Sequence, residues 1–116
     1  MMVAAMNFVA CSGDDEEGQS ENYATVHGTV VNSVTGETIS TATVELYRMI
    51  MSKYLVATTI TGTDGFFSFQ NIELKYEQTY IVEVSHPDFK PYSQAVKLKP
   101  GSKLEINASI QPKGKN

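Results

Sequence analysis

Alternation of apolar and polar residues is the feature that most constrains this chain of 116 residues. Val26, Gly28 and Val30 fall on one side of an extended backbone, and His27, Thr29 and Val31 fall on the other. The same period of two returns in short runs down to residue 110, and the runs are separated by turn residues. This pattern predicts an all-β sandwich or barrel and no long helix. The 93 residues from position 24 onward suffice for one sandwich-sized core.

We expect seven strands, at about residues 26–31, 42–47, 54–61, 66–69, 80–85, 92–98 and 104–110. Asp64 and Gly65 suit a tight turn before the fourth strand, because both tolerate positive φ angles. Pro87 ends the fifth strand, because proline cannot donate to a ladder. A helical turn is conceivable only around residues 73–78. Seven short alternating strands favour two packed antiparallel sheets over residues 24–112, followed by a tail at 113–116.

The N-terminal residues 1–10 are apolar but too short to cross a bilayer, which needs about 20 apolar residues. A run of this size that ends in the small residue Ala10 is typical of the apolar region of an export signal. No lysine or arginine precedes it, so we expect the true start upstream of Met1 and interpret residues 1–10 as a signal-peptide remnant.

Residues 11–23 contain five acids and almost nothing apolar. Such a segment buries too little surface to offset its ordering entropy, so we expect a disordered, flexible tether with a reach of about 20 Å. The formal net charge of the chain is −4, but from residue 24 onward nine basic residues face eight acids. The expected domain is therefore nearly neutral, and it lacks the basic footprint of a nucleic-acid binder.

Cys11 is the only cysteine and cannot form an intrachain disulfide. With Phe8, Val9 and Ala10 before it, Cys11 resembles the modified cysteine in the lipobox of bacterial lipoproteins. The acids that follow resemble the surface-export signal of lipoproteins in the Bacteroidetes. These resemblances imply a lipid on Cys11 that holds the chain in the outer membrane, on the cell surface or, alternatively, on the periplasmic face. The other interpretation is a free thiol in a disordered N-terminus.

Several core and turn motifs of the expected domain resemble one known family. The motifs are residues 26–31, 35–37, 42–46, 61–69 and 79–84. Together they resemble the carboxypeptidase regulatory-like domain, and the resemblance covers about residues 25–111. It implies a seven-stranded sandwich of prealbumin (transthyretin-like, Greek-key) type. In that family such domains usually accompany something larger, a peptidase or an outer-membrane receptor.

The residue types that carry chemistry are sparse. His27 and His86 lie far apart in sequence, and the pattern puts no nucleophile or orienting acid beside either one. Asp64 and Asp88 are single acids at turns, without the spacing of a metal site. We therefore expect no catalytic residue, no metal and no cofactor.

Binding residues are easier to nominate. Met49, Ile50 and Met51 form an apolar cluster between two strands. Because exposed apolar clusters are uncommon on small monomers, we expect this cluster to fold over the sandwich end or to extend a hairpin. An exposed contact patch is the alternative.

Three aromatic residues complete the candidate binding set, and they are Tyr47, Tyr54 and Phe66. We place them at outward positions near one another, where their rings could stack on sugars; isolated surface aromatics are the simpler interpretation. The overall hypothesis is a non-enzymatic envelope lipoprotein that acts as a binding or accessory module, with a protein or glycan partner. The alternatives are a carbohydrate-binding module of a glycan-uptake system and an accessory to a peptidase or other hydrolase.

Overall fold

The computed structural model describes residues 22–114, whose regular elements are all strands. They are β1 (Tyr23–Asn32), β2 (Thr43–Ile50), β3 (Ser52–Ile60), β4 (Phe66–Glu73), β5 (Gln78–His86), β6 (Phe89–Leu98), β7 (Lys103–Glu105) and β8 (Ala108–Ile110). The predicted all-β fold is confirmed. The helical turn considered at residues 73–78 does not form, and that segment is a bend between β4 and β5. No helix within residues 22–114 is long and apolar enough to span a membrane.

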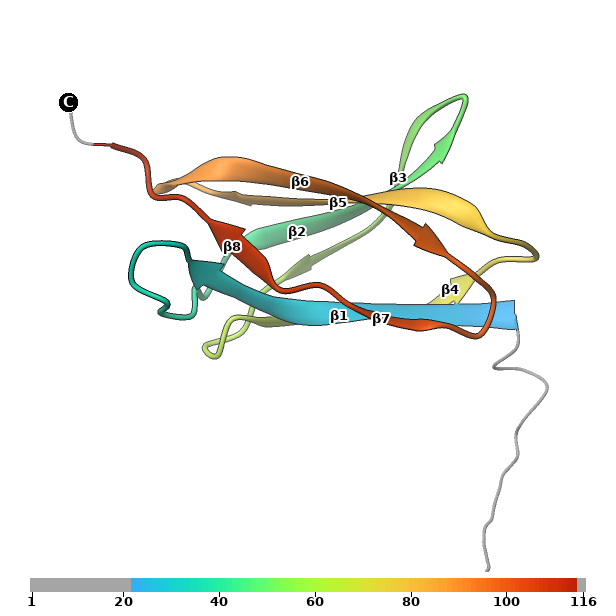
Figure 1. Ribbon diagram of the computed structural model, residues 1–116, viewed down its shortest axis with the longest axis horizontal. Coiled ribbons are helices and arrows are strands. Elements are labelled where there is room, and N and C mark those ends of the chain that lie inside the picture. The colour runs from blue at the N-terminus through green and yellow to red at the C-terminus, as the bar shows by residue number, and fades with distance from the viewer. Residues whose placement is uncertain (1–21, 115–116) are drawn as a thin grey trace, which may run out of the picture.

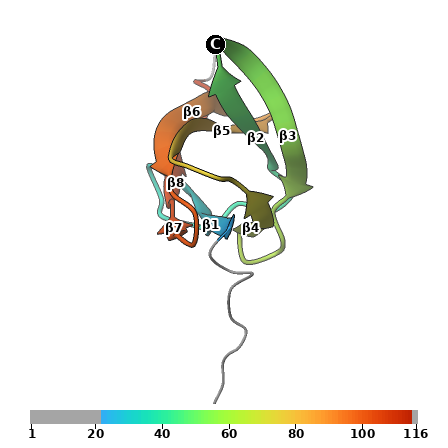
Figure 2. The same cartoon turned by 90° about the vertical axis from the view of Figure 1, so that its right-hand side faces the viewer.

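The strands form two facing sheets, which Figure 2 shows end-on as two layers. One sheet has the order β3-β2-β5-β6, and all its pairings are antiparallel. In the other sheet β1 pairs antiparallel with β4 on one side and parallel with β7 and β8 on the other. The expected last strand at 104–110 is thus two short strands, and it runs parallel to β1. The interruption lies beside Gly28, where the backbone of Ile106 crosses close to β1.

The core between the sheets consists of the inward members of each alternating run. The largest fully buried side chains are Tyr80, Phe67, Leu46 and Leu98. The inward positions expected for β1, β2 and β5 are all buried, because a period of two places every second residue on the inner face. Leu104 and Val96 are only partly buried and pack against the edge of this core. Thr61 is the one buried polar residue among those described; its hydroxyl donates to the Ile39 carbonyl and accepts from the Ala42 amide.

The two ends of the sandwich carry different connections (Figure 1). At one end lie the start of β1, the β2–β3 hairpin, the β4–β5 loop and the β6–β7 turn. Hydrogen bonds join the start of β1 to the β4–β5 loop and to the β6–β7 turn: the Leu74 amide donates to the Asn22 carbonyl at 2.9 Å, and the Gly101 amide donates to the Tyr23 carbonyl at 3.0 Å. We call this the N-terminal end of the sandwich. It is the end at which the candidate site lies.

Candidate functional site

The β2–β3 hairpin carries an exposed apolar tip. Met51 has a φ of 60° at the turn and a fully exposed side chain, and Met49 and Ile50 on its β2 side are exposed as well. In Figures 1 and 2 the hairpin projects beyond the body of the sandwich, on the side away from β1. The cluster therefore lies on the hairpin and does not fold over the core; its side chains are exposed, as in the alternative interpretation.

The edge strand β3 continues this apolar surface. Tyr54, Leu55, Val56 and Ile60 are all more than two-fifths exposed, and β3 contains no proline and only one charged residue. Of the eleven large apolar side chains exposed in the described part of the chain, seven lie between residues 49 and 60. Edge strands usually carry charges, prolines or covering segments that prevent pairing with other chains. This edge carries little of that protection.

The opposite edge of the same sheet is partly covered. The C-terminal segment runs beside the start of β6, where the Lys90 amide donates to the Gln111 carbonyl at 2.7 Å and the Lys113 amide donates to the Asp88 carbonyl at 3.0 Å. β6 also contains Pro91, which has no amide hydrogen to donate. β3 is therefore the more accessible edge of this sheet.

A groove of about 500 Å³ runs between the edge strands of the two sheets. Its walls are residues 56–59 of β3 and residues 68–73 of β4, and Arg48 and Tyr80 also contribute to it. The β3 side of the groove includes a β-bulge, because Leu46 faces Ala57 and Tyr47 faces Leu55, which leaves Val56 as the extra residue. The bulge divides the free edge into two short segments, 52–55 and 57–60.

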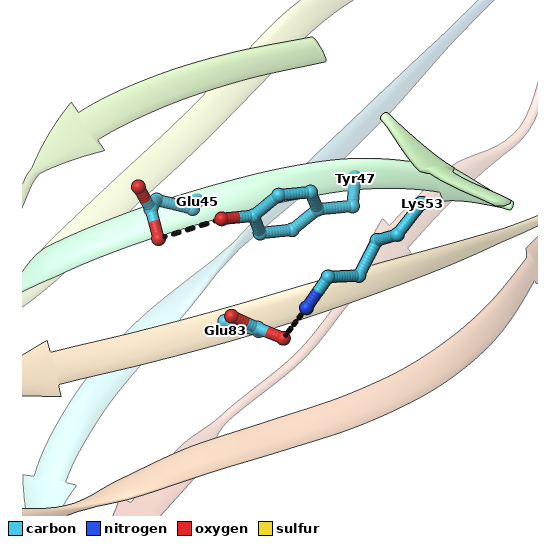
Figure 3. Close-up of polar contacts among 4 residues, drawn as sticks. All are labelled: Glu45, Tyr47, Lys53 and Glu83. Carbon is cyan, nitrogen blue, oxygen red and sulfur yellow. Dashed lines mark hydrogen bonds and ion pairs between the residues drawn. The ribbon is translucent and has the colours of Figure 1, made fainter. Parts of the chain in front are cut away.

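Tyr47 belongs to a polar cluster on the outer face of the β3-β2-β5-β6 sheet (Figure 3). Its hydroxyl donates to Glu45 Oε1 at 3.1 Å, and Lys53 Nζ lies 4.5 Å from its ring centroid while bonding Glu83 Oε2 at 2.8 Å. Partial desolvation raises the pKa of Tyr47, and the hydrogen bond to Glu45 adds to the rise. The hydrogen bond to Glu83 raises the pKa of Lys53. Because the ring is half-buried and has Lys53 over one face, it is poorly placed to stack on a ligand.

The other two aromatic candidates do not join Tyr47, so the expected aromatic group is wrong and the simpler interpretation, separate aromatics, fits the structure. Tyr54 pairs with Arg48 across the hairpin and thus shares the inner face of its sheet, whereas Tyr47 is on the outer face. Phe66 lies in the other sheet, opposite Thr29 of β1, with its ring 6.3 Å from that of His27. The bulge in β3 determines which face Tyr54 is on, and the assignment of β4 to the other sheet separates Phe66 from both tyrosines. Neither can be predicted from the alternation of apolar and polar residues.

A second concavity lies at the N-terminal end of the sandwich, under the β4–β5 loop. Arg48, at the end of β2, and Gln78, at the start of β5, both line a cavity of about 300 Å³. Arg48 Nε and Gln78 Oε1 are buried and have no hydrogen-bond partner. Tyr76, two-thirds exposed, lines this cavity and an adjoining one of about 410 Å³, which Met49 and Ile50 also border.

None of these three residues was predicted from the sequence, although a signal was present for Arg48 and Gln78. Arg48 follows Ala42, Val44 and Leu46 in the inward series of β2, and Gln78 precedes Tyr80, Val82 and Val84 in that of β5. A charged or amide side chain at a position in phase with the core is costly unless it gains a partner. Polar residues at such positions therefore indicate a site.

The histidines lie apart. His27 is in mid-β1, and His86 ends β5, where its Nδ1 accepts from the Asp88 amide at 3.1 Å and its ring meets Phe89 edge-on. No cluster of three or more potential metal ligands occurs among residues 22–114. Cys11, the signal-peptide remnant and most of the proposed tether lie outside the described residues.

Comparison with known proteins gives a family match and several similar folds. Residues 25–111 match the family model of the carboxypeptidase regulatory-like domain. No curated protein sequence matches the chain.

Three solved structures illustrate the likeness in fold. An (S)-allantoin synthase superposes with a TM-score of 0.63 at 14% identity, covering 81% of this chain and 42% of that one. Catechol 1,2-dioxygenase of Acinetobacter radioresistens gives 0.64 at 10% identity over 85% of this chain and 55% of that one. The Bacillus anthracis TIE protein gives 0.59 at 16% identity over 78% and 18%. This chain spans between 18% and 55% of these structures, and at such identities the likeness shows the fold alone.

Proposed function

Since the chain belongs to the carboxypeptidase regulatory-like domain family, we propose that it is a non-catalytic binding module of the cell envelope that binds an extended segment of a partner protein along β3. The observation that carries the proposal is the concentration of exposed apolar side chains on the β2–β3 hairpin and on the accessible edge of one sheet.

The mode of binding is the addition of a strand. The free edge of β3 offers unpaired backbone N–H and C=O groups, which an extended peptide can pair with, and side-chain pockets then supply specificity. The groove between β3 and β4 lies beside this edge and can receive alternate side chains of the added strand. Leu55 and Ile60, on the outer face, would cover apolar side chains on the other side of that strand.

The bulge at Val56 favours a short segment over a second copy of this chain. If β3 paired with itself about a two-fold axis near its middle, both bulges would meet at the axis and interrupt the ladder. A short peptide can pair with residues 57–60 alone and avoid the irregularity. A two-fold pairing of two copies centred on the middle of β3 is therefore disfavoured relative to a short peptide.

The proposal places the module at the outer membrane, held by a lipid on Cys11 and the tether of residues 11–23. Its support is the sequence around Cys11, which lies outside the described residues. β1 starts at the same end of the sandwich as the hairpin, so a tether that enters there would hold the hairpin tip toward the membrane (Figure 1). A partner embedded in that membrane would be within reach. Mass spectrometry of native material tests the anchor; an unacylated, soluble form would remove the location but not the binding mode.

The binding mode is tested with peptides selected from a display library on the full chain. We expect selected peptides to protect amide hydrogens of residues 52–60 from exchange. The double variant Leu55→Lys with Ile60→Lys should lower their affinity at least about tenfold, which corresponds to 1.4 kcal/mol. Val34→Lys is the matched control, because Val34 is equally apolar and 75% exposed but lies in the β1–β2 loop at the other end.

Two results would reject this binding mode. One is protection of β6 or β7 in place of β3 by the selected peptides. The other is a concentration-dependent dimer whose interface protects β3, since that would assign the edge to self-association.

A further inference from the structure

The cavity under the β4–β5 loop contains a donor and an acceptor that the protein leaves unused. Arg48 Nε and Gln78 Oε1 are both buried without a hydrogen-bond partner, and both residues line the same space of about 300 Å³. Within residues 22–114 the Arg48 guanidinium makes no ion pair, although Glu73 lines the same cavity; the ion pair found there is Lys53 with Glu83, on the outer face of the sheet. Two residues with unsatisfied polar atoms thus line one cavity.

Such groups are expensive for the fold alone. Each buried polar atom without a partner costs about 1–3 kcal/mol. The neighbouring inward positions, Leu46 in β2 and Tyr80 in β5, are fully buried and largely apolar, so apolar side chains suit the adjoining layer of the sandwich. We therefore propose that the cavity binds a saccharide that carries a carboxylate, of the uronic-acid kind.

Each part of this ligand has a counterpart in the walls. The carboxylate accepts hydrogen bonds from the Arg48 guanidinium, whose planar fork matches two carboxylate oxygens. A sugar hydroxyl donates to Gln78 Oε1. The ring of Tyr76, two-thirds exposed at the boundary of the two adjoining cavities, is available to stack on an apolar face of the sugar.

The charged residues that line the two cavities favour a saccharide with a single negative charge on each sugar. Lys75 and Lys97 join Arg48 as cations, and Glu73 and Glu77 oppose them. A neutral sugar would leave the charge of Arg48 and its buried Nε unpaired, which is costly. A dense polyanion such as a polyphosphate would meet both glutamates. A single carboxylate among several hydroxyls meets neither problem, because carboxylate side chains accept from sugar hydroxyls.

The test is a titration of the full chain with digalacturonic acid, followed by amide chemical shifts. Its neutral counterpart galactobiose and acetate, which supplies only a carboxylate, are titrated in parallel. We expect shifts at residues 73–79 and at least tenfold tighter binding of the acidic disaccharide than of either comparison ligand. Arg48→Met should abolish the preference for the acidic sugar, and Tyr76→Ala should weaken both sugars.

The control variant is Tyr54→Ala, because Tyr54 is a similarly exposed tyrosine that borders neither cavity. It should leave both sugars unaffected. Arg48→Lys keeps the charge but loses the fork, and we expect it to retain only part of the preference.

Four outcomes would overturn the proposal. They are the absence of shifts at residues 73–79 up to the solubility of the sugar, equal affinity for acidic and neutral disaccharides, acetate binding as tightly as the acidic sugar, and an ordered water that bridges Arg48 Nε and Gln78 Oε1 and stays in place when sugar is added. None of them bears on peptide binding at β3, which uses different ligands and variants. Either proposal can therefore fail without the other.

Discussion

Replacement of Gly28 by alanine should destabilise the domain by about 2–4 kcal/mol. A Cβ at this position would lie 1.6 Å from the carbonyl oxygen of Ile106 and 2.6 Å from its carbonyl carbon, against an ordinary contact of 3.4–4 Å. The obstacle is backbone, so no rotamer relieves it, and the link between β7 and β8 must move by roughly 2 Å. Such overpacking costs about 1–3 kcal/mol. The hydrogen bond from the Ile106 amide to the His27 carbonyl, 2.8 Å long, would be lost with it, at about 1 kcal/mol.

Gly62→Ala is the matched control for this substitution. Its Cβ would meet only the flexible carboxylate of Asp64, at 3.3 Å, so we expect a change within about 1 kcal/mol of zero. Urea unfolding followed by far-ultraviolet circular dichroism measures both. With an m-value of about 1–3 kcal/mol/M, the Gly28→Ala midpoint should fall by roughly 1–2 M. Equal midpoints for the two variants would refute the close approach of Ile106 to β1.

Three further predictions concern buried and partly buried groups. Thr61→Val removes the hydroxyl that serves two buried backbone groups and should cost about 2–4 kcal/mol in urea unfolding, whereas Thr63→Val, in the exposed turn, should change little. Phe67→Ala should cost about 3–5 kcal/mol, because Phe67 is one of the largest fully buried side chains; a loss below 1 kcal/mol would contradict its place in the core. The pKa values of Tyr47 and Lys53 are raised above 10.0 and 10.5, so the unfolded chain releases both protons first, and their contribution is intact below about pH 10 and declines above it. When the pH rises through about 10, the unfolding midpoint of the double variant Tyr47→Phe with Lys53→Met should therefore fall less than that of the unsubstituted protein.

Most of the strands could be predicted from local chemistry. Alternation in β1, β2 and β5 shows which residues face inward, because a strand turns successive side chains to opposite faces. The last strand was harder. Leu104, Ile106, Ala108 and Ile110 continue one alternation, yet the strand breaks into β7 and β8 because its backbone passes close to Gly28, more than seventy residues earlier in the chain.

The candidate site was only partly predictable. Met49, Ile50 and Met51 lie at the tip of the hairpin, and the sequence had already placed this apolar cluster between two expected strands. The unpaired edge of β3 could not be predicted, because strand order depends on which distant segments pair.

Local sequence and the packing of distant strands thus determine different features of this protein. Local chemistry, written in period-two alternation and in turn residues such as Asp64 and Gly65, determines that the chain forms short strands and which side of each is apolar. Only the packing of distant strands decides that β3 remains an open edge and that Arg48 and Gln78 share one cavity. The physical reason is range: a side chain's facing depends on its neighbours along the backbone, whereas a strand's partners and the burial of a polar atom depend on residues that only the folded chain brings near.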